Sequence, residues 1–389
     1  MVPETARDVV TNLYSGTPGV VLFHLELYAA THEDAWRDEA VRGADALGAS
    51  FAESAGADGA AGLYTGIAGI AFTLAETARI CGTERHRDAA LRALRLLHEA
   101  ARPVGAGVAW SNVNDIISGT AGTALFLLWA ARHLEHAPSR DLALRAGHRL
   151  LETGDRVEHG IDWAMSPDFA RRMPNFSHGT AGVAYTLARL HEETGERAFL
   201  DGALAGAEYL ISIARTEDGA FKLRHHDGDG ENLFYLSWCH GPAGTARLFH
   251  QLERTTGDAA WSGWVRRCAL GIQASGVPET RSEGFWNNVS QCCGNAGVST
   301  FFLDLHRTGG HNADATFARR TTADLLARAT REEGRLRWIQ AEHRVRPTEL
   351  LAQTGHMQGA SGLGSLLLYH HASEQGRPPA IVLPDSPFG

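Results

Sequence analysis

One short pattern recurs along the whole chain and limits what it can fold into. A Gly-x-x-Gly sequence is followed by an apolar run, as in SGTPGVVLFHLELY and SGTAGTALFLLWAA. The pattern occurs seven times, with first glycines at Gly16, Gly66, Gly119, Gly179, Gly241, Gly294 and Gly359, which are 50, 53, 60, 62, 53 and 65 residues apart. Repeats at such spacing indicate supersecondary units, each packing against its neighbours.

Each unit contains two kinds of helix. The run after the second glycine is apolar on nearly every face, as expected of a buried helix. The stretches between, such as 84–102, 139–154 and 197–215, place apolar residues at three- and four-residue spacing with charges between them. That spacing is typical of a half-exposed helix. We therefore expect one buried inner helix and one amphipathic outer helix in each unit.

Seven helix pairs could stack as an open solenoid or close into a ring. Solenoids usually end in polar capping units, but the first and last repeats here carry the same Gly-x-x-Gly as the others. We expect an all-α (α/α)7 toroid of seven inner and seven outer helices, forming a single domain over residues 1–389. Closure explains how one domain exceeds the about 250–300 residues at which single cores usually stop growing.

Charge and composition exclude several classes of protein. The net charge is −9, from 36 Lys and Arg against 45 Asp and Glu, whereas nucleic-acid binders normally carry a basic face. No segment approaches the about 18–20 uninterrupted apolar residues of a membrane span. The N-terminal stretch MVPETARDVVTNLYSG lacks the charged and apolar regions of a signal peptide. With five cysteines, an odd number, we expect a protein of the reducing cytoplasm.

The residues before each first glycine differ between repeats. Repeats one and two carry Ser15 and Thr65, ordinary helix-capping types. The other five repeats carry more reactive side chains: Asp115, His178, Cys239 with His240, Cys292 with Cys293, and His356. On a closed ring these five turns form one continuous arc, so we predict a functional site where the inner helices begin.

Three of these side chains suggest a metal. Thiolates are soft ligands that suit zinc in tetrahedral surroundings, and a helix N-terminus favours ionised thiols. We interpret Cys239, Cys292 and Cys293 as ligands of one Zn²⁺ with an open fourth position, as in catalytic sites. A closed structural site that also includes His240, or buried thiols without metal, are the alternatives.

The remaining polar residues have ordinary interpretations as well. Cys81, expected at an outer-helix end, and Cys268, in another amphipathic helix, are interpreted as packing or surface residues. By themselves His178 and Asp115 would be a core histidine and a capping aspartate; their place in the ring of turns favours a function for both. An α/α-toroid glycosidase would need paired carboxylates, and only Asp115 is well placed.

Taken together, the motifs resemble those of the lanthionine synthetase C-like (LanC) cyclase family. The resemblance rests on DIISGTAG, SHGTAG, SWCHG and CCGNAG, and it extends from Tyr14 to the LPDSPFG tail. It implies a toroid with zinc at its mouth. The family's metal ligands come from a tryptophan–cysteine motif and a later Cys-His-Gly, which correspond here to Cys239 and the pair Cys292–Cys293. The acid/base positions fall on Asp115 and His178.

Two features depart from the family pattern. The later motif reads Cys-Cys-Gly, a variant found in some members, which puts a thiolate in place of a neutral imidazole. We expect a more nucleophilic bound sulfur and hence a fast, less selective cyclase. Some single-chain members have an arginine four residues before the first zinc cysteine, where this sequence has Tyr235. The roles of Tyr235, His240 and His356 are left open.

The resemblance implies a zinc-dependent enzyme that forms carbon–sulfur bonds in lanthipeptide biosynthesis. Cysteine thiols of a dehydrated precursor peptide, made of leader and core, would add to its dehydroalanine or dehydrobutyrine. Because the chain has no kinase, lyase or dehydratase segment, a separate dehydratase is the expected partner. Addition of glutathione or another small thiol, and a non-catalytic scaffold stabilised by zinc, are the alternative functions.

Overall fold

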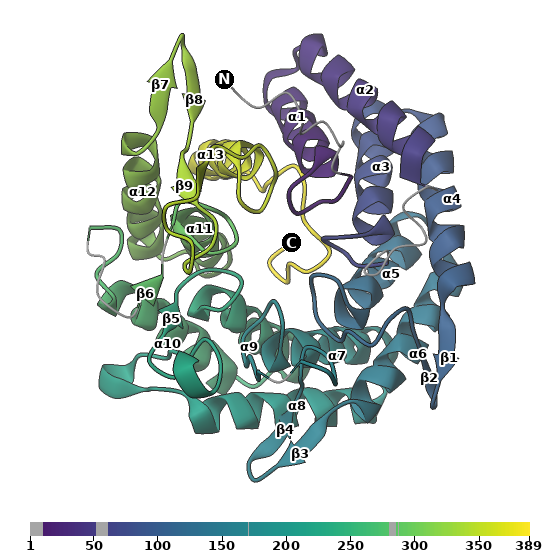
Figure 1. The fold of residues 1–389 in the computed structure, drawn as a ribbon, viewed down its shortest axis with the longest axis vertical. Coiled ribbons are helices and arrows are strands. Elements are labelled where there is room, and N and C mark those ends of the chain that lie inside the picture. Colours follow the sequence, from purple (N-terminus) through teal and green to yellow (C-terminus); the bar gives the residue numbers. More distant parts are fainter. Residues whose placement is uncertain (1–10, 52–60, 170, 280–284, 287) are drawn as a thin grey trace.

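Each Gly-x-x-Gly turn begins a helix that lines the inside of a ring in the computed structural model of the protein (Figure 1). The structure describes residues 11–51, 61–169, 171–279, 285–286 and 288–389. Residues 1–10, which hold most of the stretch without export features, lie outside the described residues. The expected toroid is confirmed, and its helices fall into two layers.

The seven inner helices follow the seven Gly-x-x-Gly turns, and each begins directly after its first glycine. They are α1 (Thr17–Thr31), α3 (Ile67–Cys81), α5 (Thr120–His133), α7 (Thr180–Thr194), α9 (Pro242–Thr256), α11 (Asn295–Gly309) and α13 (Ala360–Glu374). The second glycine lets each helix lie close to the turn before it. At Gly244, for example, a Cβ atom would overlap the carbonyl oxygen of Trp238, so only glycine fits there.

Six outer helices pack on the inner ones in the described residues. They are α2 (Asp34–Ser50), α4 (Glu84–Ala100), α6 (Ala137–Glu152), α8 (Arg197–Ile213), α10 (Ala260–Ala274) and α12 (Asn312–Ala327). Their amphipathic pattern has the expected effect: in α4, Leu94 and Leu97 are buried, while Arg92 and Arg95 are exposed. The three outer helices predicted with bounds match α4, α6 and α8 within two residues at each end.

The chain after α13 departs from the expected seventh outer helix. Residues 376–389, the C-terminal tail, contain no helix or strand and instead turn into the middle of the ring, where Figure 1 marks the C-terminus. Pro378, Pro379, Pro384 and Pro387 explain the difference, because a proline inside a helix removes a backbone donor and clashes with the preceding turn.

Backbone hydrogen bonds join the seven turns into a closed circle. In nearly every case the residue two before the first glycine donates its N–H to the corresponding carbonyl of the next turn. The bonds run from Tyr14 to Tyr64 (2.9 Å), Tyr64 to Ile117 (2.9 Å), Ile116 to Ser177 (3.1 Å), Ser177 to Cys239 (2.9 Å), Cys239 to Cys292 (3.1 Å), Cys292 to Met357 (3.0 Å) and Met357 to Tyr14 (2.9 Å). We call the face where these turns meet the mouth.

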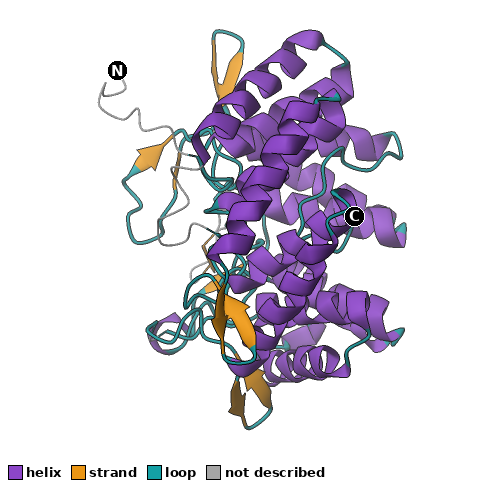
Figure 2. Ribbon diagram, turned by 90° about the vertical axis from the view of Figure 1, so that its right-hand side faces the viewer, coloured by secondary structure: helices purple, strands orange, loops and turns teal. Residues whose placement is uncertain are grey.

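Short strands connect the outer helices to the mouth. They are β1 (Arg102–Val104), β2 (Gly107–Ala109), β3 (Asp155–Val157), β4 (Gly160–Asp162), β5 (Phe234–Tyr235), β6 (Phe285–Trp286), β7 (Thr330–Glu332), β8 (Arg335–Arg337), β9 (Gln340–Ala341) and β10 (Leu350–Leu351). All pairs are antiparallel except β5–β6. Two single 3₁₀ turns are η2 (Glu217–Gly219) and η3 (Gly228–Gly230). Figure 2 shows loops and strands gathered on one face of the ring.

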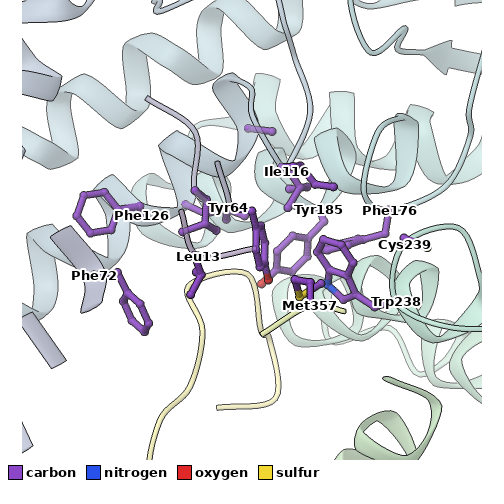
Figure 3. Close-up of a cluster of buried hydrophobic side chains, with 14 of the residues drawn as sticks. Leu13, Tyr64, Phe72, Ile116, Phe126, Phe176, Tyr185, Trp238, Cys239 and Met357 are labelled. Carbon is purple, nitrogen blue, oxygen red and sulfur yellow. The ribbon is translucent and has the colours of Figure 1, made fainter. Parts of the chain in front are cut away.

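The core lies beneath the turns. Trp238 packs edge to face on Tyr64, with ring centroids 5.1 Å apart, and on Phe176 at 5.7 Å, and Figure 3 shows these rings side by side with Tyr185 and Met357. Aromatic side chains from separate repeats therefore hold the turns of the mouth from below. No helix within the described ranges combines the length and apolar character that a membrane crossing requires.

Candidate metal centre and catalytic site

The three cysteines predicted as metal ligands meet at the mouth. The Sγ atom of Cys293 lies 3.3 Å from that of Cys239 and 3.4 Å from that of Cys292, and all three sulfurs lie within 4.8 Å of one another. Neighbouring turns bring them together, since Cys239 donates its backbone N–H to the carbonyl of Cys292. All three side chains are buried, and none forms a disulfide.

The arrangement of sulfurs fits a zinc ion. Two thiolates bound to one tetrahedral zinc at about 2.3 Å lie roughly 3.8 Å apart. The distances from Cys293 Sγ to the other two sulfurs, 3.3 and 3.4 Å, are slightly shorter than this spacing. In the part of the chain that the structure describes, they form the one group of three or more potential metal ligands, and His240 is not a member. The geometry thus favours three protein ligands over a closed site that includes His240.

The electrostatics of the cluster also favour a cation. Burial raises the pKa of the Cys239 and Cys292 thiols. Hydrogen bonds with these two thiols hold the pKa of Cys293 well below its ordinary value. One sulfur therefore ionises most readily while its neighbours keep their protons, and a positive ion is needed before all three become thiolates.

Two residues in contact with the cluster were missed by the sequence analysis. Tyr14 Oη donates a hydrogen bond to Cys292 Sγ at 3.2 Å. Gln358 Nε2 donates to Tyr14 Oη at 2.9 Å and lies 3.8 Å from Cys293 Sγ. The prediction that repeat one offers only a capping residue is wrong, because Tyr14 lies directly before Ser15. Tyr14 lies two residues before Gly16, just as Cys239 and Cys292 lie two residues before the first glycine of their own repeats. This shared repeat position could have indicated that Tyr14 lies near the cysteines.

His178 and Asp115 form a hydrogen-bonded pair at the mouth. His178 Nδ1 lies 2.6 Å from Asp115 Oδ2, and Asp115 is fully buried while about a quarter of the His178 side chain is exposed. The other carboxylate oxygen accepts hydrogen bonds from Ser118 N and Oγ, at 2.8 and 3.3 Å. Since an ionised carboxylate only accepts hydrogen bonds, Nδ1 carries the proton and Nε2 is left to exchange one.

A row of ring contacts extends from His178 to Tyr235. His240 lies 5.6 Å from His178 and stacks on His225 at 4.0 Å between centroids. His225 in turn contacts Tyr235 at 4.5 Å. Burial raises the pKa of the Tyr235 hydroxyl, and the positive charge of Arg344 nearby partly offsets that rise. Arg344 lies between β9 and β10, more than 100 residues after Tyr235 in the sequence.

His356, the last of the predicted mouth residues, does not join the cysteines. It lines a cavity of about 120 Å³ inside the ring, together with Glu26 and Asp304. Its Nδ1 has no hydrogen-bond partner among the described residues.

Two cysteines lie away from the mouth. Cys81 is the last residue of inner helix α3 and is half-buried, so its expected place at an outer-helix end is wrong. Cys268 is buried in outer helix α10, which confirms its expected place in an amphipathic helix.

Solved structures with similar folds fall into more than one class of enzyme. Nisin cyclase superposes with a TM-score of 0.70 over 94% of this chain and 89% of its own, at 14% identity. A GH76 α-mannanase of Bacteroides thetaiotaomicron gives 0.51 over 79% and 85%, at 14% identity. A protein from Listeria innocua gives 0.50 over 80% and 86%, at 15% identity. At sequence identities of 14–15%, these similarities establish the toroid fold but not the activity or the substrate.

A match to a family model assigns the chain more specifically. The model described as lanthionine synthetase C-like protein matches residues 8–383, which include the cysteine cluster and the His178–Asp115 pair. The chain therefore belongs to the lanthionine synthetase C-like protein family.

Proposed function

We propose that this protein is a lanthipeptide cyclase that forms thioether rings in a dehydrated precursor peptide. A cysteine sulfur of the peptide adds to the β-carbon of dehydroalanine or dehydrobutyrine and yields lanthionine or methyllanthionine. One observation carries the proposal: three buried cysteine sulfurs lie within 4.8 Å of one another at the same mouth as a histidine–aspartate pair, in a chain of the lanthionine synthetase C-like family.

Cys239, Cys292 and Cys293 would hold the zinc ion, and their three sulfurs leave one tetrahedral position for a ligand from the substrate. When bound, zinc supplies Lewis-acid chemistry that lowers the pKa of an incoming thiol, which otherwise titrates near about 8.5. Tyr14 supports the site by donating a hydrogen bond from its hydroxyl to Cys292 Sγ, which fixes the orientation of the cysteine side chain.

His178 would move the proton. Its Nε2 accepts the proton of the peptide thiol, the sulfur forms a bond to the β-carbon, and the electron pair of the carbon–carbon double bond moves toward the α-carbon and its carbonyl. Nε2 then returns the proton to the α-carbon, so that S–H adds across the double bond without any other reactant. Asp115 holds Nδ1 at 2.6 Å and stabilises the imidazolium that forms between the two transfers.

The proposal includes a second protein. Dehydroalanine and dehydrobutyrine arise by loss of water from serine and threonine, a different reaction from the thiol addition proposed for this site. We propose that a separate dehydratase supplies the substrate, and that both proteins act on the leader and core of one precursor peptide in the cytoplasm.

A reaction with a synthetic peptide tests the proposal. Purified protein loaded with zinc is incubated with a peptide that contains one dehydroalanine and one cysteine, and remaining thiols are then alkylated with N-ethylmaleimide. Cyclisation leaves the peptide mass unchanged but prevents alkylation, so the unalkylated fraction measured by mass spectrometry reports ring formation. We expect it to grow with time and to require His178.

The alternatives give different products. A glutathione-transferring protein would add glutathione to a dehydroalanine peptide that lacks cysteine, with the corresponding gain in mass. A scaffold would bind zinc and leave every thiol open to alkylation. Either result, with no ring formed from the first peptide, would refute the proposed cyclisation.

A further inference from the structure

Exposed apolar side chains gather in one loop at the mouth. Among the described residues, the large apolar side chains with substantial exposure are Val104, Val157, Leu270, Ile339, Val345, Leu350 and Leu351. Four of these seven lie between residues 339 and 351, a segment that we call the β9–β10 loop. A soluble protein rarely leaves such a cluster exposed unless something binds it.

The loop projects from the body of the protein. Val345, Leu350 and Leu351 are 74%, 57% and 59% exposed. Leu350 and Leu351 are consecutive residues of β10, and successive side chains of a strand point to opposite faces. Because both are exposed, neither face of β10 packs on the core. In the described residues β10 pairs only with β9, so its other edge is open to an extended chain.

The base of the loop is hydrogen-bonded to a residue that contacts the cysteine cluster. Gln340 is buried; its Nε2 donates to the carbonyl of Gln358 at 2.6 Å, and its Oε1 accepts from the N–H of Val289 at 3.0 Å. Gln358 contacts Cys293 Sγ. At the far side of the loop, Arg344 lies near the hydroxyl of Tyr235, a residue four positions before Cys239. Both contacts connect the loop that carries the exposed apolar side chains to residues beside the proposed site.

We infer that the β9–β10 loop is the docking surface for the substrate and binds an extended, apolar segment of the precursor peptide. This inference rests on the proposed function. A flexible peptide must bring one cysteine and one dehydro residue to the same centre, and binding the neighbouring segment supplies that positioning. An extended peptide fits the surface because it offers backbone groups to the open edge of β10 and apolar side chains to Val345, Leu350 and Leu351.

A binding experiment without chemistry tests the inference. Two fluorescein-labelled dehydroalanine peptides are used, with their cysteines blocked by iodoacetamide; one carries leucines beside the dehydro residue and the other carries serines. The protein variant is Val345→Ser/Leu350→Ser/Leu351→Ser. The control is Val104→Ser/Val157→Ser, which changes valines that are 38% and 40% exposed on the separate strands β1 and β3.

Fluorescence anisotropy should show that parent and control bind the leucine peptide at least tenfold more tightly than the serine peptide. The triple variant should bind both peptides equally weakly, and its zinc content should not change. Equal affinity of the triple variant and the parent for the leucine peptide would overturn the inference. So would a change in the triple variant confined to self-association in sedimentation, or to binding of a dehydratase, since the occupant would then be another copy or that partner.

The outcomes separate this inference from the proposed function. If the parent protein binds the leucine peptide through the loop but never cyclises an unblocked version, the proposed cyclase activity is refuted and the proposed docking surface stands. If parent and triple variant cyclise the unblocked peptide equally fast, and as fast with serines as with leucines, the proposed cyclase activity stands and the proposed docking surface is refuted.

Discussion

The carboxylate of Asp385 accepts a hydrogen bond from the indole Nε1 of Trp238 at 3.0 Å. Trp238 directly precedes Cys239, whereas Asp385 belongs to the C-terminal tail that enters the ring. The same carboxylate accepts hydrogen bonds from Tyr64 Oη at 3.1 Å and Arg247 Nη1 at 2.9 Å, and it is completely buried. A segment without regular structure thus supports the residue beside a proposed metal ligand from inside the ring.

Replacing Asp385 should destabilise the protein strongly. Asp385→Ala removes the carboxylate that accepts from the Trp238 indole and the Tyr64 hydroxyl. It also leaves the Arg247 guanidinium without its ionic partner, with only the backbone carbonyl of residue 385 as an acceptor there. Breaking a buried ion pair from one side costs about 3–5 kcal/mol, which urea unfolding would measure. Asp385→Asn keeps the shape and an acceptor, so its loss should be smaller. Equal stability of Asp385→Ala and the parent would show that the tail contributes little.

His178 and Asp115 should act as a unit. His178→Ala and Asp115→Asn should each lower the cyclisation rate by about 10²–10⁴-fold, the usual contribution of general acid–base catalysis, while zinc content stays unchanged. Because Asp115 acts through His178 Nδ1, the double variant should be no slower than His178→Ala. Rate losses that multiply in the double variant would assign the two residues independent roles.

The fold was largely predictable from the sequence because the repeated pattern defines most of the helices. The Gly-x-x-Gly spacing determines seven inner helices, and the alternating apolar patterns distinguish inner from outer ones. The C-terminal tail was not predictable in this way. Its prolines rule out a helix, but no periodic pattern indicates that Asp385 would lie under Trp238, 147 residues earlier.

The candidate site was predictable where chemical type and repeat position coincide. Cys239, Cys292, Cys293, His178 and Asp115 are reactive residues in the turns, and the structure places them together as two groups. Tyr14 is ordinary by type, and it meets Cys292 across 278 residues only because the ring closes. Arg344 lies in a loop outside the repeat, so neither its type nor its spacing marks its contact with Tyr235.

The cysteine cluster should be required for zinc. Cys239→Ser should reduce bound zinc from about one ion per chain to a small fraction of that, because a neutral hydroxyl replaces one of three thiolates. Cys268→Ser is the matched control, since Cys268 is equally buried but lies in α10 away from the cluster. Metal analysis after dialysis measures both. Full zinc occupancy in Cys239→Ser would remove that residue from the ligand set.

The second cysteine of the Cys-Cys-Gly motif, Cys293, should make a bound substrate sulfur more nucleophilic than a histidine at the same position would. Cys293→His exchanges a thiolate for a neutral imidazole, so the bound centre becomes less negative by one charge and donates less electron density to a substrate sulfur. We expect the variant to retain zinc in metal analysis and to cyclise the test peptide more slowly. A variant that keeps its zinc and cyclises faster than the parent would contradict this expectation.

Glu26 should make the stability of the ring depend on pH. It lies inside the ring in α1, its Oε2 has no hydrogen-bond partner among the described residues, and burial raises its pKa from 4.5 to about 7. The folded protein therefore binds a proton more tightly than the unfolded chain does. The resulting stability is complete below the unfolded pKa of 4.5 and is lost as pH rises to about 7.

Glu26→Gln should remove this part of the pH dependence. The free energy of unfolding of the variant, relative to the parent, should rise by about 3 kcal/mol between pH 4.5 and pH 8, because each pKa unit corresponds to about 1.4 kcal/mol. Asp304, whose pKa burial raises to about 6, leaves a pH dependence of the same sign in both proteins, so only their difference is diagnostic. Glu99→Gln, on the exposed face of α4, is the control and should follow the parent. A difference between Glu26→Gln and the parent that stays constant across this range would mean that Glu26 does not carry its proton into the folded interior.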